Sequence, residues 1–192
     1  MSAAPLMADG IRIRLLDAAE AGMRLDELAA ILADAVASEA SVNFLAGFSA
    51  ADGRAFWQDQ LPSLAAGSRL LLVAEDEAGL AGTVMLMLAH QPNAPHRAEI
   101  GKMLVHSRAR RRGLGRRLLQ AAEAAALGTG RTLLMLDTET GSAGEQLYRN
   151  CGWIEIGQVP GHSYTVDGRI GRTTFFYRQL AALIPLCPSA PA

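Results

Sequence analysis

The sequence predicts a mixed α/β (α+β) fold, in which a mostly antiparallel sheet of about seven strands is flanked by about four helices. Three observations lead to this prediction. Seven apolar segments of the 192-residue chain have the length and pattern of strands. Four of them form two hairpin-like pairs, which run antiparallel, whereas two others enclose a helix and must run parallel. We expect a single domain over residues 11–181, between a flexible leader at 1–10 and a flexible tail at 182–192.

Composition and charge argue against several classes of protein. Hydrophobic residues make up 50% of the chain, enough for a sizeable core, and the formal net charge is −1. A nearly neutral chain argues against nucleic-acid or membrane-surface binding, and no stretch has the ~18 apolar residues of a membrane span or the pattern of a secretion signal. Cys151 and Cys187 lack metal-type spacing. We expect a cytoplasmic protein without a metal site, a nucleic-acid partner or a membrane partner.

The N-terminal third is predicted to form one strand and two helices. Residues 11–15 alternate between apolar side chains and arginine, which is the period of a half-buried strand. Apolar residues recur at helical spacing from Met23 to about Leu45, with acidic residues early in the segment, where they favour the helix dipole. Residues 50–66 predict a second helix, interrupted or ended near Pro62, because proline cannot donate a helical hydrogen bond.

The rest of the chain is predicted to form a hairpin, a strand–helix–strand crossover, a short helix and two closing strands. Glycines at 128 and 130 end the helix of the crossover, and residues 161–171 form a turn-rich loop between the closing strands. The predicted strands are 70–75, 80–89, 98–106, 132–137, 153–159 and 173–180, and the predicted helices are 114–128 and 142–151.

Residues 102–119, KMLVHSRARRRGLGRRLL, are the segment around which the chain is organised. Gly113 and Gly115 allow a ligand to approach the main chain, and the first N–H groups of the following helix lack intrahelical partners. With the helix dipole and the surrounding arginines, these N–H groups predict a site for a di- or triphosphate group. The predicted cofactor-binding residues of this turn are Arg110, Arg111, Arg112, Gly113, Leu114, Gly115 and Arg116.

Two motifs in this order resemble those of the GNAT superfamily of N-acetyltransferases. RxxGxG at 110–115, after an apolar strand, resembles the acetyl-CoA pyrophosphate motif, and LYxxxGW at 147–153 resembles a later LYxxxGF motif. The resemblance covers residues 11–180. Within the superfamily, the stretches AEIGKMLVHSRARRRGLGRRLL, LLMLDTETGS and GQVPGHSYTVDGRIGRTTFFYRQL are most similar to the tabtoxin-resistance acetyltransferase group.

The resemblance implies a GNAT fold with a V-shaped splay between strands 4 and 5. It also implies direct acetyl transfer from acetyl-CoA to the primary amine of a small molecule in a ternary complex, without a metal. The main chain of Met103, Leu104 and Val105 would pair with the pantetheine arm, and an N–H group of Leu104 or Val105 could steady the thioester oxygen. The N–H groups of residues 111–116 would bind the pyrophosphate. Homodimers are frequent in the family, so a homodimer is an option.

Tyr148 is the expected general acid, because the family tyrosine at this position points its phenol at the CoA sulfur. The alternative is that it packs on Trp153 with its hydroxyl in water. Glu99 matches a family glutamate that relays a proton through water, and Asp137 lies beside the same splay. Either carboxylate could act as the base, bind the substrate ammonium or form an ion pair. A strand places Glu99 more than ~13 Å from Met103 unless a bulge shortens the path.

Other residues have simpler roles than catalysis. His106 is expected to be structural, His162 and Tyr164 to lie in an exposed loop, and Ser142 to cap a helix, although Thr138, Glu139 and Ser142 could also contact CoA or substrate. Gly141 occupies a position where many family members carry asparagine, so a side-chain contact with the cofactor is missing or replaced by the main chain. Four aromatic residues line the acceptor pocket or pack in the core: Phe44, Phe48, Phe56 and Trp57.

Two functions besides small-molecule acetylation stay open from the sequence. A non-catalytic acyl-CoA-binding or regulatory domain would keep the arginine turn, although it would have no need of Tyr148 as an acid. An acetyltransferase acting on a protein or peptide amine would keep both motifs. Nothing in the predicted pocket elements singles out one acceptor, because a few pocket residues can change specificity.

Overall fold

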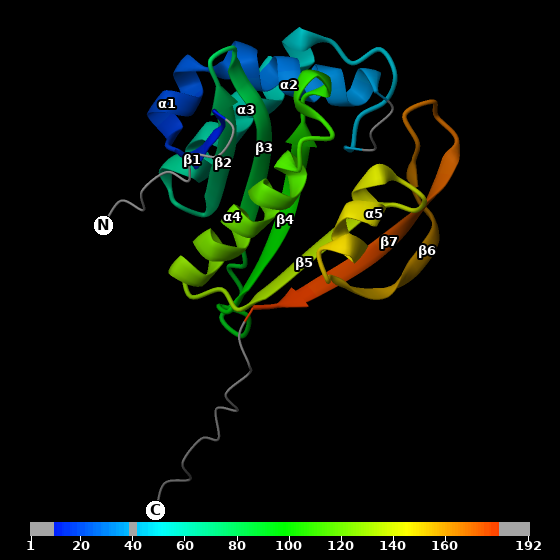
Figure 1. Cartoon of the computed structure of the whole chain (residues 1–192). Helices are drawn as coiled ribbons and strands as arrows, with labels where there is room; N and C mark the ends of the chain where they lie inside the picture. The colour runs from blue at the N-terminus through cyan, green and yellow to red at the C-terminus, as the bar shows by residue number, and fades with distance from the viewer. Residues whose placement is uncertain (1–9, 39–41, 181–192) are drawn as a thin grey trace, which may run out of the picture.

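A seven-stranded sheet forms the centre of the computed structural model, which describes residues 10–38 and 42–180 (Figure 1). The strand order is β1-β2-β3-β4-β5-β7-β6, and among these pairs only β4 and β5 run parallel. The predicted mixed, mostly antiparallel sheet is therefore confirmed. The strands are β1 (Arg12–Leu16), β2 (Arg69–Asp76), β3 (Gly79–Leu88), β4 (Arg97–Val105), β5 (Leu133–Glu139), β6 (Ile154–Tyr164) and β7 (Ile170–Gln179).

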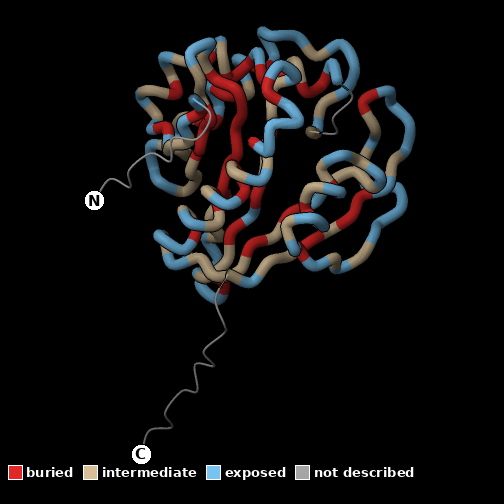
Figure 2. The backbone as a smooth tube through the Cα atoms, in the orientation of Figure 1, coloured by how far each residue is buried: buried red, intermediate tan, exposed pale blue. Residues whose placement is uncertain are grey.

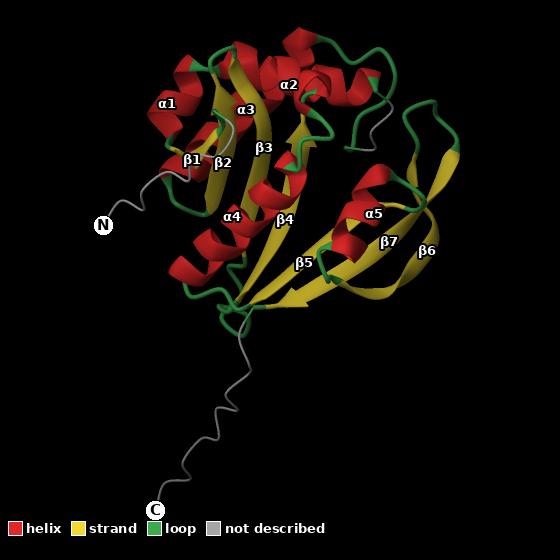
Figure 3. Ribbon diagram, in the orientation of Figure 1, coloured by secondary structure: helices red, strands yellow, loops and turns green. Residues whose placement is uncertain are grey.

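Helices cover both faces of this sheet (Figure 3). They are α1 (Ala18–Met23), α2 (Leu25–Ala37), α3 (Ala50–Ala65), α4 (Leu114–Gly128) and α5 (Ala143–Asn150). Side chains of α4 and Tyr148 of α5 pack on one face and form the α4 core. Side chains of α1, α2 and α3 pack on the other face and form the α2 core. Figure 2 shows the buried residues concentrated along the central strands and the helices that cover them, whereas the outermost strand, β6, is largely exposed.

The predicted helix from Met23 to Leu45 is wrong in its boundaries. It corresponds to α2, which begins at Leu25 and already ends at Ala37. The short helix before it, α1, was not predicted: Asp17 caps α1 by accepting a hydrogen bond from the Glu20 N–H, and the chain leaves helical geometry at Arg24.

Helix α3 has the predicted range to within one residue, but Pro62 does not interrupt it: the helix continues to Ala65, and so near its end the missing N–H costs one bond. One further boundary differs from prediction. The predicted loop at 161–171 is mostly strand, because Tyr164 of β6 pairs with Ile170 of β7 and leaves only a short turn between them. The predicted leader at 1–10, apart from Gly10, and the predicted tail at 182–192 lie outside the described residues.

The sheet opens between β4 and β5, as predicted. These strands pair only from Arg97 to Glu99, opposite Leu133 to Met135, and then diverge (Figure 3). The pairing of β4 with β3, on its other side, is irregular as well. Thr83 pairs with Leu104 and Met85 pairs with Gly101, so three steps along β4 stand opposite two along β3. One extra residue in β4 makes this a bulge. The main chain of Lys102 accordingly has φ +47°, in the left-handed region.

Candidate active site

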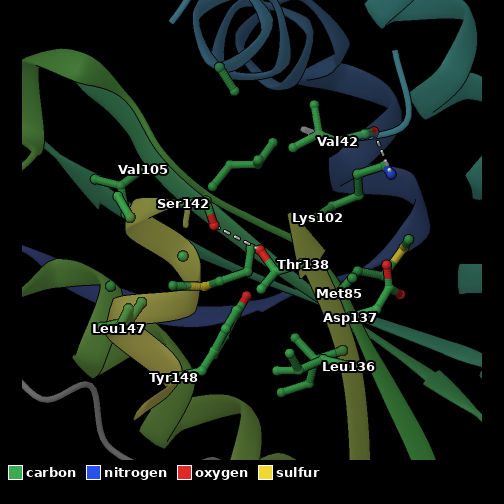
Figure 4. Close-up of a pocket in the computed structure, with 18 of the residues that line it drawn as sticks. Val42, Met85, Lys102, Val105, Leu136, Asp137, Thr138, Ser142, Leu147 and Tyr148 are labelled. Atoms are coloured by element: carbon green, nitrogen blue, oxygen red, sulfur yellow. Dashed lines mark hydrogen bonds between the residues drawn. The ribbon is translucent and has the colours of Figure 1, made fainter. Parts of the chain in front are cut away.

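One large cavity, of about 1350 Å³, lies in the opening between β4 and β5 (Figure 4). Its walls come from β4, β5, the start of α4, α5 and the segment after α2. Of the predicted cofactor-binding residues all but Arg112 line it, and so do the predicted catalytic residues. The predicted residues in its walls are Glu99, Met103, Leu104, Val105, Arg110, Arg111, Gly113, Leu114, Gly115, Arg116, Asp137 and Tyr148.

The arginine turn leaves the start of α4 open to a ligand. Arg111 and Gly113 have φ of +61° and +73°, and Gly113 is the N-cap residue, without a side-chain hydrogen bond to the first N–H groups. A Cβ at Gly113 would meet no atom within 4 Å, whereas a Cβ at Gly115 would lie 3.0 Å from Leu147 of α5. Gly113 therefore serves the turn, and Gly115 permits close packing of α4 against α5.

The arginines of this turn divide into two groups. Arg110 binds Asp34 of α2 at 3.1 Å and donates from Nε to the Val105 carbonyl at 2.9 Å, so its side chain supports the loop. Arg116 donates to the Asn150 carbonyl at 3.3 Å. Within 10–38 and 42–180, Arg111 and Arg112 form no hydrogen bond or salt bridge. These two guanidinium groups retain the donors that a phosphate requires.

Tyr148 lies between the α4 core and the cavity. Its ring packs on Trp153 and Phe176, with centroid distances of 5.9 and 6.1 Å, and the residue is 6% exposed. The phenol nevertheless points into the cavity (Figure 4), so packing on Trp153 and facing the site occur together. Burial raises the pKa of Tyr148, and the negative charge of Asp137 raises it further. The phenol stays protonated over the physiological range.

The two candidate carboxylates stand on different strands. Asp137 projects from β5 into the cavity, close enough for its charge to act on both Tyr148 and Lys102. Glu99 lies where β4 and β5 last pair, opposite Met135, and also lines a second cavity of about 200 Å³. Asp137 is thus the nearer electrostatic neighbour of the predicted acid.

Lys102 is a residue whose place in the site sequence reasoning missed. Its Nζ donates to the Val42 carbonyl at 3.1 Å and lies 5.4 and 5.1 Å from the ring centroids of Phe44 and Phe56 (Figure 4). Burial lowers the pKa of Lys102. The signal in the sequence that could have indicated this role is that Lys102 is a charged residue within an apolar strand.

Several polar residues hold the site's loops in place. His106 caps the short turn after β4 and lies 3.7 Å from Asp34, so it is structural as predicted. Ser142 caps α5 by accepting from the Glu145 N–H, also as predicted. Gly141 has φ +86° and donates its N–H to Glu145 at 2.5 Å.

His162 forms a hydrogen bond with Thr173 and an edge-to-face contact with Phe175, and it is absent from the cavity wall. Within the described ranges, no group of three His, Cys, Asp or Glu side chains could hold a metal ion. In the same residues, no helix is both long and apolar enough to cross a membrane.

Solved structures of acetyltransferases have a similar fold. The chain is 21% identical to yncA, a proposed acetyltransferase from Salmonella typhimurium with its cofactor acetyl-CoA, with a TM-score of 0.69 and coverage of 89% of this chain and 94% of that one. A proposed phosphinothricin N-acetyltransferase is 25% identical, with a TM-score of 0.70 and coverage of 89% and 99%. Ribosomal-protein-alanine N-acetyltransferase from Brucella melitensis is 25% identical, with a TM-score of 0.68 and coverage of 87% and 98%.

A family model identifies the chain more directly. Residues 28–153 match the model of the acetyltransferase (GNAT) family, and this match spans both motifs and the cavity between them. The resemblance to the GNAT superfamily and the predicted enzyme class, an acetyltransferase, are thereby confirmed. The chain belongs to the acetyltransferase (GNAT) family.

Proposed function

We propose that this protein transfers the acetyl group of acetyl-CoA to a primary amine of a small molecule, by direct attack in a ternary complex. One observation carries the proposal. The open N-terminus of α4, the gap between β4 and β5, and the protonated phenol of Tyr148 all face a single cavity. We also propose that the enzyme is cytoplasmic, where acetyl-CoA is available as the donor.

The residues present fit acetyl-CoA. Arg111 would bind the pyrophosphate together with the free N–H groups at Gly113 and the start of α4, and Arg112, outside the cavity wall, would add positive charge. Beyond Glu99 the β5 side of β4 has no strand partner, so its main-chain groups can pair with the amides of the pantetheine arm. When bound there, the thioester supplies the acetyl group to be transferred.

Side chains of the protein would accept and donate the protons that the reaction moves. Asp137 would accept a proton from the acceptor ammonium, which makes the amine nucleophilic. A main-chain N–H group of Leu104 or Val105 would stabilise the negative charge that develops on the carbonyl oxygen. As the nitrogen–carbon bond forms and the carbon–sulfur bond breaks, Tyr148 would donate its hydroxyl proton to the departing sulfur. The proton that the acylated nitrogen then loses would restore the phenol.

A small acceptor is favoured by a bridge beside the cavity. Val42, which follows α2, lines the cavity, and the nearby Ala46 N–H donates to the Val166 carbonyl in the β6–β7 turn at 2.8 Å. This bond joins the segment after α2 to the β6–β7 hairpin. The motif resemblance to the tabtoxin-resistance group and the phosphinothricin enzyme among the similar structures support a small amine. A ribosomal-protein N-acetyltransferase of equal identity keeps a protein N-terminus as the second candidate.

The decisive experiment combines calorimetry with a thiol-release assay. Acetyl-CoA is titrated first. Thiol release is then followed with small amines and with peptides that begin with alanine or serine. Binding together with turnover on small amines supports the proposal. Turnover on peptides alone transfers the function to protein acetylation. Binding without turnover on any acceptor identifies a regulatory acyl-CoA-binding domain, and the absence of binding contradicts all three functions.

A further inference from the structure

The part of the cavity on the sheet face opposite α4 is called here the acceptor half, and the part beside the start of α4 the cofactor half. Four charged side chains face the acceptor half. The alternation of strand residues assigns them to this face, because their sequence neighbours belong to the α4 core. These neighbours are Leu70 of β2, Ala98 and Ile100 of β4, and Leu136 of β5. The four charged residues that line the cavity here are Arg69, Glu99, Lys102 and Asp137.

Lys102 reaches this face only because of the bulge in β4. Strict alternation from Glu99 and Gly101 would turn the next side chain toward α4, yet Lys102 contacts Phe44 and Phe56 on the opposite side. A left-handed main chain at a residue with a side chain costs about 1–3 kcal/mol. The Thr83 hydroxyl holds the bulge by donating to the Lys102 carbonyl at 2.8 Å. The fold thus holds an unfavourable main-chain geometry that places an ammonium in the cavity.

These four charges are left without an oppositely charged partner among the residues that the structure describes. Elsewhere, arginines such as Arg14, Arg24 and Arg149 each bind two carboxylates. Among the residues that the structure describes, none of the four forms a salt bridge within 4.0 Å, and Lys102 satisfies one of its three donors, at Val42. Arg69 and Lys102 are half-buried cations without a counter-charge in this part of the chain, which is costly, whereas Glu99 and Asp137 are exposed carboxylates. The cavity is therefore suited to a ligand that carries an anion for the cations and an ammonium for a carboxylate.

The charges also follow an order along the cavity. The charge of Asp137 acts on Tyr148, where the acid is expected, and on Lys102. The charge of Arg69 also acts on Lys102 and lowers its pKa. The adjoining second cavity, which Arg69 and Glu99 share, is also lined by Arg97, whose buried Nε has no hydrogen-bond partner. Asp137 therefore lies toward the phenol, whereas Arg69 and Glu99, which carry opposite charges, lie toward the second cavity.

We propose that Lys102 is a specificity-determining residue that binds an acidic group, such as a carboxylate, of the acceptor amine, with Arg69 adding charge behind it. The acceptor class is an amine that also carries an anion, held with its nitrogen at Asp137. This inference rests on the proposed acetyl transfer to a small amine. It excludes polyamines and extended basic side chains as preferred acceptors, because they would place a second cation beside Lys102.

A purely structural role for Lys102 makes a different prediction. If its ammonium only fastened the segment at Val42, removing the charge would lower stability and would slow all acceptors alike. If its ammonium binds the anionic group of the acceptor, removing the charge slows the reaction of acidic acceptors alone. The two roles are separated by acceptors that differ only in that charge.

The test compares α-amino acids with their carboxamides, with acetyl-CoA as donor. In the unaltered enzyme we expect kcat/KM to favour the acids by about 10–100-fold, the effect of one or two charge-assisted hydrogen bonds. Lys102→Met should abolish this preference and leave the carboxamide rates within about threefold. Lys102→Arg keeps the charge and should retain most of the preference. Arg12→Met, at an exposed arginine of β1 outside the cavity, is the matched control.

A second measurement does not depend on turnover. Thermal unfolding in the presence of CoA should be shifted upward by the amino acids more than by the carboxamides, and Lys102→Met should lose this difference. Equal shifts and equal rates for acid and carboxamide, or the same preference in Lys102→Met, would overturn the inference. Failure of acetyl-CoA to bind in calorimetry would instead refute the proposed function, so the two failures are distinct.

Discussion

Asp34 of α2 and Arg110 of the arginine turn form a salt bridge of 3.1 Å. The same carboxylate accepts hydrogen bonds from the Ser107 N–H at 2.8 Å and the Ser107 hydroxyl at 2.6 Å. Burial alone would raise the pKa of Asp34, but the bonds from Ser107 and the charges of His106 and Arg110 lower it. Asp34 therefore ties the helix beside the acceptor half to the loop that shapes the cofactor half.

Replacing this carboxylate should loosen the cofactor loop. Asp34→Asn removes the counter-charge of Arg110 and weakens both bonds from Ser107, so the N–H groups at Gly113 lose part of their preorganisation. We expect the Kd for acetyl-CoA in calorimetry to rise about 3–10-fold, with kcat at saturation little changed. Asp59→Asn, at an exposed aspartate of α3, is the control. An unchanged Kd would limit Asp34 to a role in folding.

Tyr148→Phe should separate chemistry from binding. Phenylalanine retains the packing on Trp153 and Phe176 but removes the proton donor, so kcat should fall about 10²–10⁴-fold while acetyl-CoA affinity persists. Because burial raises the pKa of Tyr148, the unaltered enzyme should lose no activity through its deprotonation below about pH 10. Tyr164→Phe, at a tyrosine that is 62% exposed and outside the cavity, should behave normally. A normal kcat in Tyr148→Phe would remove the phenol from the mechanism.

The two candidate bases can be ranked by paired amide variants. The charge of Asp137 acts on Tyr148, whereas Glu99 lies where β4 and β5 still pair. We therefore expect Asp137→Asn to lower kcat/KM about 10²-fold and Glu99→Gln to lower it by less than about fivefold. The reverse order of effects would assign the proton transfer to Glu99 through water.

Local sequence signals were enough for the sheet and for the cofactor half of the site. Strand period, the glycines of the arginine turn and the LYxxxGW motif act over a few residues, and the turn at Gly113 and the cap at Ser142 have the predicted geometry. The two glycines of the turn illustrate the limit. Gly115 is also required by its distance to Leu147 of α5, a contact between residues far apart in sequence.

The acceptor half depends on relations that one strand cannot reveal. The bulge at Lys102 follows from the register between β3 and β4, and its ammonium meets a carbonyl 60 residues away, at Val42. The break at Arg24 is similar, because the arginine joins Glu27 of its own helix to Glu75 of β2. Periodicity reports which face is buried and not where the main chain bends.

The ion-pair network around Glu75 predicts how stability depends on pH. Hydrogen bonds from Arg14, against the opposing effect of burial, and from Arg24 lower the pKa of Glu75 from 4.5 to about 2. A carboxylate whose folded pKa is depressed contributes its full stabilisation above pH 4.5 and loses it as the pH falls toward 2.

Glu75→Gln should therefore destabilise the fold by about 1–3 kcal/mol at pH 7, because two half-buried guanidinium groups lose a shared partner. Denaturant unfolding should show the difference from the unaltered protein shrinking between pH 4.5 and 2, as protonation makes Glu75 resemble glutamine. Glu77→Gln, at an exposed turn two residues away, should show no such difference. A gap that stays constant down to pH 2 would mean that Glu75 stabilises the fold by packing, because the contribution of its charge must disappear in that window.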